Sequence, residues 1–367
     1  GFSLGQLRAR MDGADIVASR SGESWDVAAD ISAERLSGWT GEIFEGSSIQ
    51  WSGQVTTGDG FSANGQVDAH DFAYRDFQAS RLWGPAGIEK IEGGYRIALN
   101  AQTDGMTYPA EVLASALGPD PDLAVAMDWV SEARELRMES LMLDGRSAQL
   151  EGRGQVRLND RNYEFSGDVR ARDLSAMADI TGQAISRFSL AGDFDGAVSF
   201  ELDGRASELA GHPAFERLGT DIRFNGSANR SAQGLWVIDR ARANGDGLLV
   251  RWQASQSDTG DWTADGEAAL DAAMDLGPLV LAGGAAAAFD ARTEEGVLIW
   301  RLDATSPALA AGPLDVENPR VRVEGRGGVD AFTADMRVTA DTQYGAVDIG
   351  GQIARGEGWR VTGLDGT

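Results

Sequence analysis

The chain has 367 residues, of which 42% are hydrophobic, so it can build an apolar core and is unlike intrinsically disordered sequences. Its 57 acidic and 32 basic residues give a net charge of −25, which opposes binding to nucleic acid and direct attraction to anionic membrane surfaces. The absence of cysteine excludes a disulfide scaffold, thiolate metal sites and thiol catalysis.

The 48 glycines, with abundant Asp, Asn, Ser and Thr, predict many short strands joined by turns. No Pro-rich or Ser-rich linker and no block of one charge divides the sequence, so we expect one continuous elongated segment over residues 1–367. Because Gly1 is not an initiator methionine and Thr367 ends within the strand pattern, we interpret the sequence as an internal fragment of a longer polypeptide. The most apolar run, 279–289, is too short for the roughly 20 residues of a transmembrane helix.

The first clear hairpin covers residues 49–69. Apolar and polar residues alternate with a period of two on both sides of a Gly-containing and Asp-containing turn at 57–60. Side chains of a strand point alternately to its two faces, so one face is apolar. That face carries Ile49, Trp51, Gly53, Val55, Phe61, Ala63, Gly65, Val67 and Ala69.

The next stretch is less regular. Residues 95–101 continue the strand pattern, and residues 111–118 predict a short helical interruption. Residues 122–143 are ambiguous, because 123–130 fits a helix whereas the later apolar residues alternate as in a strand. Those alternating residues are Leu136, Met138, Leu141 and Leu143.

The clearest hairpin covers residues 150–171, with turn chemistry at 159–162. Its apolar positions are Leu150, Gly152, Gly154, Val156, Leu158, Tyr163, Phe165, Gly167, Val169 and Ala171. Two more short helices are predicted near 173–182 and 207–218, because each apolar stretch is preceded by a capping residue and followed by glycine.

The pattern in the second half of the sequence predicts further strands. The strand-like runs are 198–204, 222–228, 248–254, 262–270, 297–304, 321–325, 334–340 and 346–353, and their apolar positions include Phe200, Leu202, Trp252 and Trp300. Short turns separate most of these runs, so successive strands should pair as an antiparallel meander; a parallel solenoid fits less well.

The predicted sheet has an apolar face that needs a cover, and the usual covers are a second sheet or a layer of helices. The predicted helices are too few, and the frequent Gly and Ala at apolar positions give a smooth, shallow face. We therefore expect an all-β fold with few short helices, a long, twisted antiparallel β-sheet curled into a groove with a hydrophobic concave face. The pattern alone is equally consistent with a sandwich or solenoid in which apolar faces pack together.

No chemical site stands out. The two histidines, His70 and His212, do not belong to a cluster with metal-ligand spacing. The sequences at 193–196 and 244–247 resemble parts of a calcium loop, but the complete ligand spacing is missing, so they are interpreted as turns. We therefore predict no catalytic residue, metal or cofactor, and no enzymatic activity.

One sequence pattern resembles that of a known family. The pattern Leu-x-Leu-x-Gly-x-x-Ala-x-Leu-x-Gly-x-Gly-x-Val, followed by Tyr-x-Phe-x-Gly-x-Val-x-Ala-x-Asp-Leu, runs from Leu141 to Leu174. It resembles the AsmA-like superfamily of bacterial envelope bridge proteins, with TamB-like and YdbH-like members. The likeness extends over most of the chain, is most specific between 141 and 204, and includes no invariant catalytic signature.

The resemblance implies a periplasmic protein of Gram-negative bacteria that is anchored in the inner membrane by a helix absent from this sequence. It implies a lipid-conducting bridge that moves or shields phospholipid between the inner and outer membranes and contributes to outer-membrane biogenesis. The expected partners are phospholipid acyl chains, both membranes through parts outside the fragment, and an outer-membrane β-barrel protein for a TamB-like member. The choice between TamB-like and YdbH-like stays open, because neither diagnostic end is in the sequence.

These inferences predict a lipid-binding groove. Its expected residues are Ile49, Trp51, Val55, Phe61, Val67, Leu150, Val156, Leu158, Tyr163, Phe165, Val169, Phe200, Leu202, Trp252 and Trp300. The alternative is a β-repeat structural or adhesion protein with a packed core and no lipid.

Overall fold

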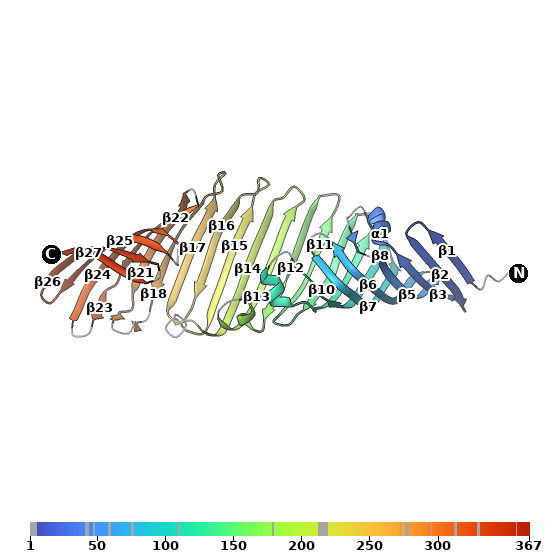
Figure 1. Cartoon of the computed structure of the whole chain (residues 1–367), viewed down its shortest axis with the longest axis horizontal. Helices are drawn as coiled ribbons and strands as arrows, with labels where there is room; N and C mark the ends of the chain where they lie inside the picture. The colour runs from blue at the N-terminus through green and yellow to red at the C-terminus, as the bar shows by residue number, and fades with distance from the viewer. Residues whose placement is uncertain are drawn as a thin grey trace. The chain divides into compact units, whose positions relative to one another are not determined.

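A computed structural model describes residues 6–40, 44–46, 48–57, 60–74, 77–108, 111–177, 180–211, 219–271, 273–275, 279–294, 296–311, 314–328, 331–356 and 358–367. The chain divides into two compact units. Unit 1 contains residues 1–179 and 183–193, and unit 2 contains residues 180–182 and 194–367. Both are built almost entirely from antiparallel strands (Figure 1).

Unit 1 begins with short strands and continues with strands of nine to fifteen residues. Its strands are β1 (Gln6–Met11), β2 (Ala14–Ser21), β3 (Ser24–Ile31), β4 (Phe44–Glu45), β5 (Ser48–Thr57), β6 (Phe61–Tyr74), β7 (Phe77–Ile91), β8 (Gly94–Asp104), β9 (Asp122–Val130), β10 (Glu135–Asp144), β11 (Ala148–Arg157), β12 (Asn162–Ala171) and β13 (Thr181–Asp193). Its helices are α1 (Ala33–Thr40) and α2 (Glu111–Leu117).

Neighbouring strands of unit 1 pair in chain order, except that β4 pairs with β6 and β3 pairs directly with β5. Tight turns allow consecutive strands to pair. In the β1–β2 hairpin the turn is Asp12-Gly13, and Gly13 has φ +70°, the left-handed conformation that tight hairpin turns require. The sheet remains open, because among the described residues β1 pairs only with β2.

Unit 2 is a second antiparallel meander. Its strands are β14 (Val198–Ala210), β15 (Ile222–Arg230), β16 (Trp236–Asn244), β17 (Leu248–Gln256), β18 (Trp262–Leu270), β19 (Met274–Asp275), β20 (Leu279–Leu281), β21 (Ala285–Glu294), β22 (Val297–Thr305), β23 (Ala308–Ala311), β24 (Leu314–Gly327), β25 (Phe332–Thr342), β26 (Gly345–Arg355) and β27 (Trp359–Gly366). The short strands β19, β20 and β23 form side pairings, so β18 pairs with β21 and β22 with β24. Among the described residues β27 pairs only with β26.

The helical predictions have mixed outcomes. Helix α2 occupies the predicted interruption at 111–118. The helix predicted at 173–182 is wrong over its described part: only Leu174–Ala176 form a 3₁₀ turn, and Thr181 already belongs to β13. Of the helix predicted at 207–218, residues 207–210 are the end of β14 and 212–218 lie outside the described residues. Neither α-helix is long and apolar enough to span a membrane.

Burial shows where a core is missing. Most buried apolar residues of the described chain are alanines, and the larger ones are Leu117, Leu209 and Leu270. Packed interiors of globular proteins instead bury many large apolar side chains. The predicted all-β fold with a long open antiparallel sheet is confirmed, whereas neither unit by itself forms a sandwich with a packed core.

Candidate apolar binding face

The strand register places apolar residues of unit 1 on one face. Residues that pair across an antiparallel ladder lie on the same face, so a row can be followed from strand to strand. One complete row takes a residue from each successive long strand and contains only apolar residues and glycine: Leu7, Ala18, Val27, Gly53, Gly65, Ala86, Leu99, Val125, Leu141, Gly152, Gly167 and Phe188.

A β-bulge in β10 keeps this row intact. The alternation slips by one residue between Met138 and Leu141, where the pairing register shifts on both sides of the strand. The bulge adds one residue to β10, so Leu136 and Met138 stay on the same face as Leu141. Strand β10 therefore contributes apolar side chains along its whole length.

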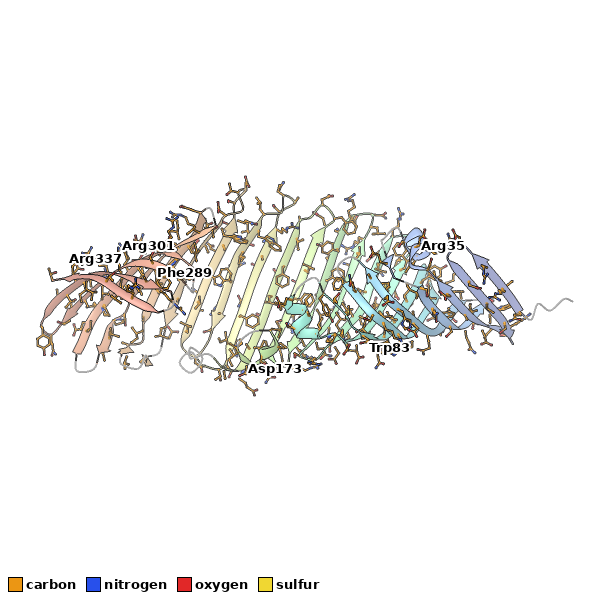
Figure 2. The ribbon with its side chains drawn as sticks, in the orientation of Figure 1. Arg35, Trp83, Asp173, Phe289, Arg301 and Arg337 are labelled. Carbon is orange, nitrogen blue, oxygen red and sulfur yellow. The ribbon has the colours of Figure 1, made fainter. Side chains whose placement is uncertain are left out.

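Unit 2 repeats the arrangement. Its central row is again apolar or glycine throughout: Leu202, Gly226, Ala241, Trp252, Gly266, Phe289, Leu302, Val323, Met336 and Gly351. Figure 2 labels Phe289, which comes from β21. We call the apolar surface of each unit its apolar face.

The apolar faces are only half-buried. In β5, Ile49, Trp51 and Val55 are partly exposed, while Gln50 and Gln54 on the other face are exposed. Trp252 in unit 2 is 37% exposed. Because a covering layer would bury such large side chains, each face has apolar surface available for a ligand.

Glycines opposite aromatic residues make the faces shallow. A Cβ atom at Gly325 would lie 2.3 Å from the ring of Trp300, its partner across the ladder, and one at Gly266 would lie 2.5 Å from the ring of Phe289. The rings thus lie over the glycine backbone of the neighbouring strand. Aromatic rings that cover cross-strand glycines are a known device for stabilising such positions.

The opposite face is polar and carries ion pairs between neighbouring strands. Arg96 donates two hydrogen bonds of 2.9 Å to the carboxylate of Asp128, and Arg81 binds Asp68 in the same two-pronged way. The hydrogen bond from Arg96 lowers the pKa of Asp128, and the bond from Arg81 lowers the pKa of Asp68. These carboxylates are held in the charged form, as a water-facing surface requires.

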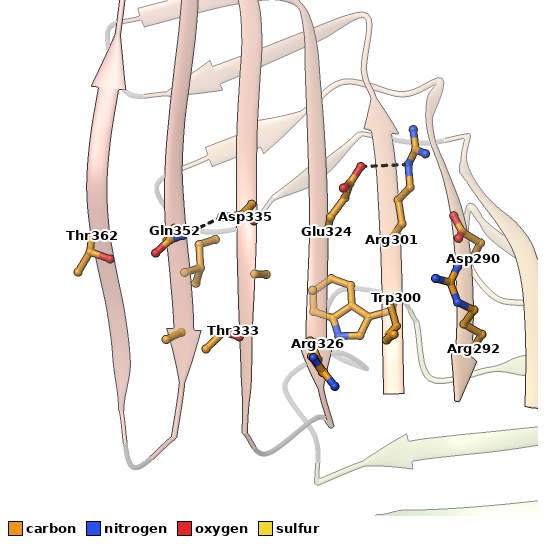
Figure 3. A pocket seen from close by; sticks show the side chains of 15 residues that line it. Asp290, Arg292, Trp300, Arg301, Glu324, Arg326, Thr333, Asp335, Gln352 and Thr362 are labelled. Atoms are coloured by element: carbon orange, nitrogen blue, oxygen red, sulfur yellow. Dashed lines mark hydrogen bonds and ion pairs between the residues drawn. The ribbon is translucent and has the colours of Figure 1, made fainter. Parts of the chain in front are cut away.

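Unit 2 has a hollow of about 650 Å³ that is lined by residues of β21 to β27 (Figure 3). Its lining combines charged and amide side chains of the polar face with Trp300 and Ile353 of the apolar face. Arg301 lies 2.8 Å from Asp303 and 3.8 Å from Glu324, and Gln352 donates to Asp335 at 3.0 Å. Arg301 thus lies beside two carboxylates, and Asp335 accepts a hydrogen bond from an amide, contacts that are ordinary for a solvated sheet surface.

No metal centre forms among the described residues, where no three acidic or histidine side chains gather with suitable geometry. His70 lies on the polar face, with Nε2 3.1 Å from Oδ1 of Asp68. His212 lies outside the described residues. The turn at 193–196 and the one at 244–247 are likewise without such a cluster.

The predicted groove residues fall on the apolar faces with one exception. In unit 1 these are Ile49, Trp51, Val55, Phe61, Val67, Leu150, Val156, Tyr163, Phe165 and Val169; in unit 2 they are Phe200, Leu202, Trp252 and Trp300. The prediction that Leu158 belongs to the strand is wrong. Strand β11 ends at Arg157, and Leu158 lies in the following turn, where it is 42% exposed. The turn begins one residue earlier than the alternation suggested.

Sequence reasoning missed several members of the apolar faces. Trp129 pairs with Tyr95 and Leu136, and Phe188 pairs with Gly167, so both belong to the face of unit 1. Alternation could have identified Phe289, since every second residue around it is apolar. Trp83 is different: it lies on the polar face, where the Arg81 guanidinium carbon is 4.7 Å from its ring centroid.

Comparisons with known proteins do not extend this description. No family model matches the chain, and no curated protein or solved structure is similar to it at a significant level.

Proposed function

We propose that the apolar faces bind the acyl chains of phospholipids, and that the chain is a lipid-conducting segment of a bacterial envelope protein. The observation that carries the proposal is the uninterrupted apolar row of each unit, which is half-buried and includes glycine–aromatic pairs such as Gly266 with Phe289. Such a surface offers hydrophobic contact without the directional groups of a selective pocket.

The energy scale suits this function. Removing an acyl chain from water gains about 0.8 kcal/mol for each buried CH₂ group. A sixteen-carbon chain that lies along the face and shields half of its surface would gain roughly 6 kcal/mol. This is enough to hold a lipid chain without any residue that is individually essential.

The resemblance to the AsmA-like superfamily supports the same proposal. The sequence pattern that carries the resemblance, from Leu141 to Leu174, covers parts of β10, β11 and β12 and supplies part of the apolar face of unit 1. On this proposal the protein works in the periplasm, is anchored through a segment outside the sequence, and carries phospholipid between the inner and outer membranes. It acts as a conduit and catalyses no reaction.

The proposal is tested by lipid extraction from the purified chain, followed by mass spectrometry, and by photo-crosslinkers placed on alternate residues of one hairpin. Val156 and Phe165 on the apolar face should crosslink to lipid, whereas Gln155 and Glu164 on the polar face should not. The absence of extracted lipid together with crosslinks at neither position would overturn the proposal and favour a structural or adhesive β-repeat protein.

A further inference from the structure

One border of the apolar face in unit 2 has a distinct chemistry. It lies at the strand ends next to the turns at 231–235 and 257–261, and at the facing ends of β24 and β25. The paired residues of this border are Arg230 with Trp236, Gln256 with Trp262, and Phe332 with Arg355. Cationic, amide and aromatic side chains thus occupy these positions of the border, whereas Thr293, Leu298 and Gly327 occupy the strands between them.

Aromatic rings take part in the contacts at this border. The guanidinium carbon of Arg230 lies 6.0 Å from the ring centroid of Trp236, and Nε of Arg230 donates to the carbonyl of Gly234 at 3.4 Å. Phe332 packs edge-on against Trp300 with a centroid distance of 5.4 Å. Trp and Arg combine an apolar body with a polar tip, and this pairing is typical of the boundary between water and hydrocarbon.

The rows toward the opposite border are aliphatic. The row two residues beyond the central one contains Ala243, Val250, Ala268, Ala287, Ala304, Val321, Val338 and Ile349. The next row includes Leu248, Leu270 and Ala285. Apart from Phe224 of β15, which pairs with Ala243, these rows are aliphatic, so the apolar face of unit 2 changes from amphipathic to mainly aliphatic along the direction of its strands.

The length of this gradient matches one lipid. Along β18, Trp262 and Leu270 mark its two ends, and eight residues of antiparallel strand span about 27 Å. A phospholipid occupies one leaflet of a bilayer, about 20 Å including the headgroup. One lipid can therefore lie along the strands with its head at the cationic border and its chains on the aliphatic rows.

We propose that the Arg230–Trp236 pair on β15 and β16 and the Phe332–Arg355 pair on β25 and β26 form two separate headgroup sites along this border, each for the phosphate of one anionic phospholipid, and that each site fixes the direction in which its lipid lies. The inference rests on the proposed function, because it requires acyl chains on the apolar face. Arginine suits the task because its planar guanidinium presents several donors to phosphate oxygens.

The orientation is tested with two phosphatidylglycerol probes, one photoreactive in the headgroup and one at the end of an acyl chain. Peptide mapping after irradiation should place the headgroup label near Trp236 and Trp262 and the chain label near Ala287 and Val338. Both labels spread over both borders would overturn the headgroup sites while leaving lipid binding intact. Labelling by neither probe would contradict the proposed function itself, and this inference with it.

The charge requirement is tested with the double variant Arg230→Gln/Arg355→Gln. Its affinity for phosphatidylglycerol should fall about fivefold at each site, since each site loses the one arginine that strengthens its binding to a lipid phosphate. Its affinity for diacylglycerol with the same chains should not change. The matched control is Arg240→Gln/Arg242→Gln, which removes the same charge from the polar face of β16. Equal losses in the two double variants, or an equal loss for both lipids, would contradict the sites.

Discussion

The two faces of each sheet share one backbone but use their side chains in opposite ways. In unit 1 the polar face carries a row that is largely charged: Ser62, Glu89, Arg96, Asp128, Arg137, Gln155 and Glu164. Arg96 pairs with Asp128 across strands, Arg137 pairs with Glu135 of its own strand, and Glu164 pairs with Arg157, so most charges of the polar face have partners on that face. The apolar face has no comparable internal partners and is left half-buried. The difference teaches that the side chains of the polar face stabilise the sheet, whereas the apolar face has surface available for a ligand.

The largest expected effect comes from placing a charge on the apolar face. Val156→Arg should reduce the amount of lipid crosslinked at β11 by about a hundredfold, because an acyl chain bound there would have to desolvate the guanidinium. Gln155→Arg, one residue away on the polar face, is the matched control. Quantitative mass spectrometry of crosslinked lipid at β11 provides the measurement. Similar losses in both variants would mean that the two faces do not differ in lipid binding.

A smaller effect is expected from a glycine pair on the apolar face. Gly152 and Gly167 are directly paired, but a Cβ at Gly167 would lie 2.0 Å from the carbonyl oxygen of Glu151, whereas one at Gly152 would lie 3.3 Å from that of Ser166. Gly167→Ala should therefore lower the free energy of unfolding by about 2 kcal/mol, as overpacking does. Gly152→Ala should cost much less. Urea unfolding followed by tryptophan fluorescence compares them, and equal costs would contradict this packing.

The polar face is probed by Asp128→Asn. Asp128 is largely buried beside Arg96, and its replacement should lower the free energy of unfolding by about 1 kcal/mol near neutral pH. The pKa of Asp128 is lower in the folded chain than its ordinary value of 3.8. Its contribution is therefore complete above that value and is lost as the pH falls through the lowered pKa. Unfolding curves of the parent and variant should converge in acid; a constant gap would contradict the linkage.

The smallest effect is expected at an exposed pair on the same face. Arg187 and Asp168 are 3.8 Å apart, and their side chains are 82% and 46% exposed. Water screens such a pair, so Asp168→Asn should leave the midpoint of urea unfolding almost unchanged. A loss as large as that of Asp128→Asn would show that exposure does not separate the two ion pairs.

Much of the apolar face could be predicted because alternation and turn chemistry are local properties of the sequence. Val156 and Phe165 alternate with polar residues, and this pattern alone assigns them to one face. The slip between Met138 and Leu141 is also visible in the sequence, but only the pairing of β10 with both neighbours shows that it is a bulge. Because the sequence alone does not reveal the bulge, it assigns residues 122–143 neither to a helix nor to a strand.

Other features depend on tertiary pairing that local patterns do not contain. The residues at 207–210 have helical capping signals, yet they extend β14, because the strand ladder overrides local propensity. Helix α1 was not predicted, since Ala33–Thr40 has only a weak apolar stripe. The cationic border of unit 2 was equally hidden, because Arg230 and Trp236 become neighbours only through the β15–β16 register.

The glycine–aromatic pairs have a further consequence for movement. Neighbouring strands are about 4.8 Å apart, and along the central row of each unit every strand presents an apolar residue or glycine. A glycine beside an aromatic ring keeps the face low between neighbouring strands. On the proposed function, an acyl chain that shifts sideways by one strand therefore stays in contact with apolar groups. The proposed movement is one-dimensional diffusion across the strands, during which the acyl chain stays out of water.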